Sequence, residues 1–486
     1  MGIAARWKPI FNNVMSFRKQ MRIEAMMKLR RKALALAVTA AVVGGGVSVA
    51  QAQSVAINAG SLGQALVYPY LTSLGGWNSF LHVTNTSSAT VAAKVRFRAA
   101  ADSADAYDFI LVLSPYDMWT GVVEQQNGLV GFRPTDSTCT VPYFGKGTFT
   151  PFIVQSPEVY AEVILMGVSI GLSSSANPVA VAAKHTTAGV PASCSTVEAA
   201  FANPSSVSGA TEFNLPLNGA TIGSGSNTIA ANMLTGKYDL TNVGLGQSGA
   251  GRAVAIANFF PTGGTFINTG MWSQSPGDWD HPTLAEGTAG LSTLNTALNK
   301  TALINEWVLN PNLGELSEWT VTFPTKKLYV DAITPINAIS TQSSKLTPFG
   351  STATPNCVTV TPSIFNREEK QLVGASPGTS SLCNEANVIA FKNGSVNSSS
   401  VLGSAVAVTV DTTLLGTTGV LAGWMNLAMP TTQLQGGLGN TTLPSFSTTT
   451  TLATAGSSPG RPAVGFNLTS RATPDDAVLY DHAYLP

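Results

Sequence analysis

Residues 79–100 read SFLHVTNTSSATVAAKVRFRAA, and this stretch indicates the fold. From residue 91 onward apolar and cationic side chains alternate, so that one face would carry Val91, Ala93, Val95 and Phe97 and the other Lys94, Arg96 and Arg98. A period of two is typical of a β-strand with one buried face and one solvated face. Residues 80–84 form a shorter strand, and the Asn-Thr-Ser-Ser that follows favours a local turn. We therefore expect a β-hairpin over 79–98.

The same kind of unit recurs along the chain. After a polar loop, residues 109–113 form a third apolar run that ends at Ser114-Pro115. Further short β-rich runs, separated by Gly, Pro, Asn and Ser, cover 160–166, 253–260, 319–323, 388–391, 405–410 and 465–468. Many short strands with this punctuation are typical of all-β folds. We expect an immunoglobulin-like or jelly-roll-type β-sandwich with long Ser/Thr/Gly-rich loops and at most one or two short helices, the best candidate being 291–307.

Residues 80–115 combine three short motifs. A strand ends in Val-Thr-Asn-Thr-Ser, an Ala-x-Val-x-Phe strand follows at 93–97, and Phe-x-Leu-x-Leu-x-Pro occupies 109–115. This combination resembles a module of bacterial exported cell-surface proteins with immunoglobulin-like sandwiches. The resemblance implies a β-sandwich and a role at the surface, and it transfers no functional residues.

Composition limits the classes of function. The chain has 486 residues and 44% hydrophobic content, enough for a large core. Only 11% of the residues are charged, against ~25% in a typical soluble protein, which suits an extracellular protein. With the nine Lys/Arg and one acidic residue of 1–52 set aside, 17 basic and 25 acidic residues remain, a net charge of −8. We expect no nucleic-acid partner, because phosphate contacts need clustered Lys and Arg.

The N-terminal region has the pattern of an export signal. Basic residues at 28–32 precede an apolar run at 33–43, and Ala50-Gln51-Ala52 is an A-x-A cleavage site. We expect residues 1–52 to be a signal peptide read by the Sec pathway, with the functional start at Met26 or Met27 and cleavage after Ala52. The apolar run is short of the ~20 residues that a spanning helix needs. No later run reaches that length, so we expect no integral membrane segment after cleavage.

Two β-rich regions follow the predicted signal peptide. We expect an N-terminal β-sandwich region at 53–275 and a C-terminal β-rich region at 276–486, with one continuous domain as the alternative. The expected location is extracellular or at the cell surface, with the periplasm as the alternative.

Four cysteines agree with export, because an even number in an oxidising compartment indicates disulfides. We expect Cys139–Cys194 and Cys357–Cys383, since each pair brackets a loop-rich stretch. The closed spans of 55 and 26 residues would stabilise the fold by roughly 4 and 3.5 kcal/mol through chain entropy. A zinc site would need C-x₂₋₄-C spacing, which the sequence lacks.

The densest group of functional side chains is Gly277-Asp278-Trp279-Asp280-His281-Pro282. Asp278 and Asp280 are our candidates for a Ca²⁺ site, because Ca²⁺ takes carboxylate and carbonyl oxygens. Trp279 could offer its ring to a sugar. The competing interpretation is an ordered loop in which the Asp side chains accept from backbone N–H groups. Ca²⁺ is the only cofactor that the sequence brings into consideration.

Glu158 and Glu162 would face the same way on a strand, as the two carboxylates of a glycosidase do. A solvated strand face has the same pattern, and we favour that interpretation. Gly244–Gly249 matches G-x-G-x-x-G, but a strand follows, so we expect a glycine-rich turn. Among the histidines, His82 is expected on a strand face, and Asp481-His482 could join a distant Ser in a triad.

No motif justifies a catalytic assignment, and we expect a protein that is not an enzyme. The favoured function is a secreted or cell-surface structural or adhesive protein that can self-assemble into a layer or filament. Its partners would be copies of itself, other surface proteins or glycans. The alternative is an exported protein that binds carbohydrate or hydrolyses glycosides.

Overall fold

The computed structural model describes residues 55–168, 178–202, 232–259, 291–310, 313–328, 357–371, 380–393, 397–398, 400–405, 407–412, 421–429, 441–442, 449–450, 460–472 and 475–485. Residues 53–486 form one compact unit. The predicted signal peptide at 1–52 lies outside the described residues. The division of the chain at 275/276 stays a prediction.

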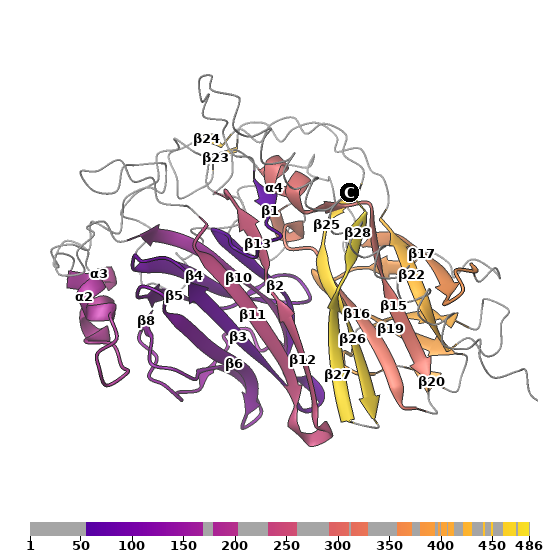
Figure 1. Ribbon diagram of the computed structural model, residues 1–486, viewed down its shortest axis with the longest axis horizontal. Coiled ribbons are helices and arrows are strands. Elements are labelled where there is room, and N and C mark those ends of the chain that lie inside the picture. Colours follow the sequence, from indigo (N-terminus) through magenta and orange to yellow (C-terminus); the bar gives the residue numbers. More distant parts are fainter. Residues whose placement is uncertain are drawn as a thin grey trace, which may run out of the picture. The chain divides into compact units, whose positions relative to one another are not determined.

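The first half of the described chain is a sandwich of two antiparallel sheets, as predicted (Figure 1). Sheet A has the strand order β1-β13-β2-β10-β4-β5-β8, and sheet B the order β12-β11-β3-β6-β7-β9. Aromatic rings from both sheets meet between them: the ring centroids of Phe97 of β4 and Phe132 of β7 are 5.6 Å apart. The strands are β1 (Ala56–Ile57), β2 (Ala65–Thr72), β3 (Trp77–Asn85), β4 (Val91–Ala99), β5 (Asp105–Leu113), β6 (Met118–Gln126), β7 (Leu129–Pro134), β8 (Cys139–Val141), β9 (Thr150–Pro151), β10 (Glu158–Val168), β11 (Leu234–Asn242), β12 (Gln247–Arg252) and β13 (Val254–Ala257).

The stretch 79–98 is not a hairpin, so that prediction is wrong. β3 pairs with β11 and β6 in sheet B, whereas β4 lies between β10 and β5 in sheet A. The chain therefore crosses from one sheet to the other between the two strands. Asn85 holds this crossing, because its Nδ2 donates to the carbonyl oxygens of Ala89 (2.7 Å) and Ser114 (2.9 Å). Alternation predicts strands and faces, but it does not select a strand's partner.

The second half contains a second sandwich, made from one 11-stranded sheet that folds over on itself. β15 and β16 connect its two layers, and they pair only at Leu309–Leu316 and Asn310–Glu315. Sheet C has the order β18-β17-β22-β15-β28; in sheet D, β19, β16, β26 and β27 pair in turn, and β20 and β21 pair with β19. The strands are β15 (Ala302–Asn310), β16 (Glu315–Thr322), β17 (Val358–Asn366), β18 (Ser380–Leu382), β19 (Ala386–Asn393), β20 (Asn397–Ser398), β21 (Val408–Asp411), β22 (Ala422–Ala428), β26 (Val464–Ala472), β27 (Asp475–Asp481) and β28 (Ala483–Leu485). Small pairs are formed by β14 (Asn299–Lys300) with β25 (Arg461–Pro462) and by β23 (Thr441–Thr442) with β24 (Thr449–Thr450).

Three short α-helices are described, one more than predicted: α2 (Pro178–Ala183), α3 (Cys194–Ala202) and α4 (Leu291–Leu298). The predicted helix 291–307 ends at Leu298, and Trp307 belongs to β15. Leu294 and Leu298 are buried, as the helical spacing indicates. After α4 the chain continues as β15, whose backbone forms hydrogen bonds with β22. This pairing depends on residues far away in the sequence, so the local spacing of apolar residues does not predict it.

The apolar core of the first sandwich extends to one face of sheet D. Phe466 of β26 packs against Tyr70 of β2 and Tyr238 of β11, with ring centroids 6.5 and 5.6 Å apart. The Trp77 indole N–H donates to the carbonyl oxygen of Val401 at 2.7 Å. One face of sheet D therefore packs on the first sandwich, while its other face packs on sheet C.

Candidate functional site

Neighbouring strands of sheet A carry paired charges on the face turned away from sheet B. The register places Arg96 of β4 opposite Asp108 of β5 and Glu162 of β10. Lys94 Nζ lies 2.9 Å from Asp108 Oδ2, and Arg96 Nε lies 3.7 Å from the same oxygen. Opposite charges on adjacent strands stabilise a sheet. We call the following residues the charge cluster: Lys94, Arg96, Arg98, Asp105, Asp108, Glu162, Lys327 and Glu385.

The cations of β4 are buried, so the predicted solvated face is wrong. Lys94, Arg96 and Arg98 are each at most 1% exposed. The same correction applies to Glu158 and Glu162 of β10, which are 9% and 0% exposed rather than solvated. Sheet A is covered on both faces: α2 and α3 pack on the apolar end of this outer face. Alternation shows that two faces differ in chemistry, but it cannot show which of them is in water.

The second half of the chain completes the charge cluster. Lys327, in the short 3₁₀ turn η5 (Lys326–Leu328), forms an ion pair with Glu162 and lies with its Nζ 3.3 Å from the Tyr160 hydroxyl. The Lys327 backbone N–H donates to Glu385 Oε2 at 3.2 Å. Next to it, the Ala386 N–H donates to the carbonyl oxygen of Ala100 at 2.9 Å. These contacts join the two halves through polar groups.

Burial shifts the titration of the charge cluster. It lowers the pKa of Lys94 to about 7 and that of Lys327 to about 8. It also raises the pKa of Asp108, and it raises that of Glu385 to about 7. Shifted groups gather at active sites, but structural ion networks shift them too. With four cationic and four anionic side chains, most of them closed off from solvent, we interpret the cluster as structural.

A further carboxylate is buried where the sandwiches meet. The Tyr70 hydroxyl donates to Glu158 Oε1 at 2.6 Å, and Glu318 Oε2 accepts from the Leu402 N–H at 2.7 Å. Burial raises the pKa of Glu318 to about 7, and the charge of Glu158 acts in the same direction. Both carboxylates are enclosed, so they do not present an open pair to a substrate.

An open pocket in the second sandwich is the candidate ligand site. It lies where β15 and β16 separate after their two paired positions. Side chains of β16 replace the missing ladder: Ser317 Oγ accepts from the Val308 N–H at 2.8 Å, and Trp319 Nε1 donates to the carbonyl oxygen of Glu306 at 2.8 Å. The separation of the strands therefore leaves no unsatisfied backbone at these positions.

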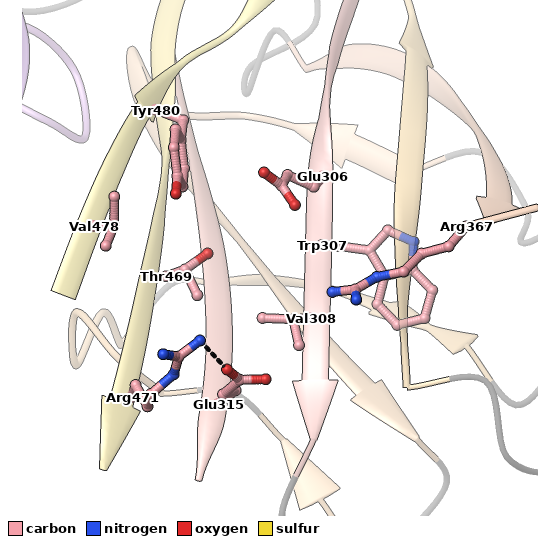
Figure 2. A pocket seen from close by; sticks show the side chains of 9 residues that line it. All are labelled: Glu306, Trp307, Val308, Glu315, Arg367, Thr469, Arg471, Val478 and Tyr480. Atoms are coloured by element: carbon pink, nitrogen blue, oxygen red, sulfur yellow. Dashed lines mark ion pairs between the residues drawn. The ribbon is translucent and has the colours of Figure 1, made fainter. Parts of the chain in front are cut away.

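The pocket has a volume of about 250 Å³ and a mixed polar lining. Figure 2 shows Arg471 and Glu315 in an ion pair on one side, with Glu306 and Arg367 reaching in from the other. Two carboxylates and two guanidinium groups give the lining a formal charge of zero at neutral pH. The lining residues are Glu306, Trp307, Val308, Glu315, Arg367, Thr469, Arg471, Val478 and Tyr480.

The walls of the pocket are tied together. Asn305 of β15 donates through Nδ2 to the carbonyl oxygens of Tyr480 (3.1 Å) and Asp481 (3.3 Å) of β27. Its amide also lies 3.1 Å from Nδ1 of the buried His482. The ring of the lining residue Trp307 stacks on Phe391, with the two ring centroids 5.9 Å apart. Side chains that project from strands fixed in this way are held ready for a ligand.

Both predicted disulfides are present, Cys139–Cys194 and Cys357–Cys383, and no cysteine is free. The first ties the start of α3 to β8 on the outer face of sheet A. The proposed Ca²⁺ ligands Asp278 and Asp280 lie outside the described residues. In the part of the chain that is described, no group of three or more His, Cys, Asp or Glu could hold a metal ion.

The remaining candidates have structural surroundings. His82 lies on the outer face of sheet B, with Nε2 2.9 Å from Asp239 Oδ2 and Nδ1 3.2 Å from Thr120 Oγ1. Burial lowers the pKa of His482 to about 4, and its Nε2 lies 2.9 Å from the Thr320 carbonyl oxygen. Gly246 adopts a left-handed conformation (φ 65°) in the turn between β11 and β12. The G-x-G-x-x-G match is therefore a glycine-rich turn, as expected.

Sequence reasoning missed the pocket, because its residues come from four strands and a turn between positions 306 and 480. No local spacing connects Glu315 with Arg471, which become neighbours only through the pairing of β16 with β26. The one available signal was the alternation of β16, which identifies a strand and nothing about its partner.

No family model, curated protein or solved structure matches the chain. Among the described helices, none is long and apolar enough to cross a membrane.

Proposed function

We propose that this protein is an exported structural or adhesive protein of the cell surface. The observation that carries the proposal is the pairing of all four cysteines in two disulfides. Such bonds persist in oxidising compartments and are rare in a reducing cytosol. The low content of charged residues and the predicted export signal at 1–52 support the same location.

The edge strand β27 supports self-assembly as part of this function. β27 pairs with β26, and among the described residues no strand pairs with its other edge. Val478 and Tyr480 of this strand are 39% and 44% exposed. An unpaired edge can add a strand from another chain, which is how β-augmentation builds assemblies.

Surface labelling of intact cells tests the location. We would express the complete chain in a bacterial host, add a membrane-impermeant biotin reagent, and trap free thiols with an alkylating reagent at lysis. The proposal predicts biotinylated protein with four unalkylated cysteines and an N-terminus at Gln53. Labelling only after lysis, together with four alkylated thiols, would place the protein in the cytosol and contradict the proposal.

Carbohydrate binding is the second candidate function, and the pocket between β15, β16, β26 and β27 favours it. Its lining combines hydrogen-bond donors and acceptors with the half-exposed ring of Tyr480, the combination that recognises hydroxyl-rich ligands. Glycoside hydrolysis receives less support, because Glu158 and Glu162 are buried.

A further inference from the structure

An aromatic pair stands on the outer face of sheet C, next to the pocket. The register places Phe365 of β17 opposite Trp424 of β22, and Trp424 opposite Glu306 of β15. Residues in register share one face of an antiparallel sheet. The neighbours Ile364 and Met425 point the other way, into the core between sheets C and D. Phe365, Trp424 and Glu306 therefore form a row across three strands on the outer face.

The two rings form a parallel stack. Their centroids are 3.8 Å apart and their planes differ by 4°. Both side chains are only partly buried, although each ring covers one face of the other. Two adjacent, partly exposed rings on a strand face offer apolar surface to which a ligand can bind.

Glu306 belongs both to this row and to the pocket, so the two features are continuous. The pocket is small for a ligand site, since sites for drug-sized ligands have ~300–1,000 Å³. Its size suits one sugar ring, and the row beside it can accept the next units of a chain. The zero formal charge of the lining favours an uncharged ligand over an acidic or basic one.

We propose that Phe365, Trp424 and the pocket form the binding site of a neutral carbohydrate chain. Apolar C–H faces of the sugar rings pack against Trp424, where burial of carbon surface stabilises the complex. Glu306 accepts hydrogen bonds from sugar hydroxyl groups, and Arg367 donates to them. The inference rests on the second proposed function, carbohydrate binding, and specifies its site and its ligand class.

Affinity electrophoresis with soluble polysaccharides tests the proposal. The purified, oxidised full chain would be run in gels containing β-glucan, xylan, mannan, starch, polygalacturonate or alginate. Retardation by at least one neutral polysaccharide is expected. Trp424→Ala and the isosteric Glu306→Gln should each weaken that binding about tenfold.

Two control variants isolate the site. Glu368→Gln removes an exposed carboxylate next to Arg367 that does not line the pocket, and Tyr143→Ala removes a tyrosine as exposed as Tyr480. Both should bind like the wild type. Circular dichroism would verify that each variant folds. If Trp424→Ala does not fold, Glu306→Gln alone tests the site.

The outcomes separate this site from the function on which it rests. In one outcome, the wild type binds a neutral polysaccharide that Glu306→Gln and folded Trp424→Ala bind equally well. That result would support carbohydrate binding as a function but would overturn this site. Binding only to polygalacturonate or alginate would overturn the neutral ligand class. Absence of binding to every polysaccharide would overturn both the site and the second proposed function.

Discussion

Several charged side chains of this protein are buried at positions where the sequence pattern predicts exposure to solvent. Lys94, Arg96 and Arg98 alternate with apolar residues, as on any half-solvated strand, yet all three are buried. Their alternation predicts the strand correctly and the environment incorrectly. The difference arises because α2, α3 and η5 cover the outer face, and their positions depend on contacts far apart in sequence. Local pattern therefore predicts secondary structure here better than it predicts burial.

Removal of Lys327 tests whether the charge cluster stabilises the fold. Lys327→Met removes one cation beside the buried Glu162 and leaves Arg98, whose Nε lies 3.9 Å from Glu162 Oε2. Removing a partner from a buried ion pair costs up to about 3–5 kcal/mol. Lys392→Met is the matched control, because Lys392 is 40% exposed in its 3.4 Å pair with Asp411 and should lose less than about 1 kcal/mol. Urea denaturation would give both values. Equal free energies of unfolding for the two variants would contradict the structural role of the cluster.

The raised pKa of Glu318 should make the stability of the fold depend on pH. Its pKa is about 7 in the folded chain and near 4.5 when exposed, so between these values the folded state holds a proton that the unfolded state has lost. This contribution to stability is complete below pH 4.5 and is lost as pH rises through 7. Glu318→Gln should therefore raise the free energy of unfolding at pH 8 by up to about 3 kcal/mol and change it little at pH 4.5.

Thermal or urea unfolding at pH 4.5 and pH 8 checks this expectation. Gln keeps one oxygen to accept from the Leu402 N–H. A variant that is less stable than the wild type at pH 8 would mean that the ionised carboxylate stabilises the interface, contrary to the burial argument.

At the scale of elements, the sequence predicts most strands and fails on their partners. The runs at 160–166, 388–391 and 465–468 lie within strands, and the run at 319–323 extends one residue beyond β16. The hairpin over 79–98 is instead a crossing between sheets, because Asn85 bonds the chain to Ser114 and because β10 and β5 flank β4. β5 follows β4 after a short loop, but β10 begins only at Glu158, so no local turn signal reports that β4 pairs with β10.

Asn85→Ala tests the crossing. The change removes the hydrogen bonds that Asn85 donates to Ala89 and Ser114 and leaves both carbonyl oxygens without this donor. We expect a loss of about 2–3 kcal/mol, since each such bond contributes about 1 kcal/mol and buried acceptors are costly to desolvate. Ser88→Ala changes an exposed residue of the same crossing and should be neutral. A neutral Asn85→Ala in urea denaturation would show that strand pairing alone holds the crossing.

At the scale of the whole molecule, the two sandwiches are joined by apolar, aromatic and ionic contacts. Tyr70, Phe466, Lys327 and Glu162 come from both halves and meet in the described unit. The sequence gives no sign of this, because it predicts two β-rich regions without the contacts between them. The same pairings place β27 at an edge of sheet D and assemble the pocket.

Light-scattering mass of the purified, oxidised protein, recorded with and without Ca²⁺, tests whether the chain self-assembles. We predict assemblies much larger than one chain, and Val478→Lys should reduce them because a lysine on an edge strand opposes further pairing. Val243→Lys is the matched control, since Val243 is exposed in the turn between β11 and β12 and should leave the mass unchanged. A mass equal to one chain in the wild type, with Ca²⁺ and without it, would contradict self-assembly.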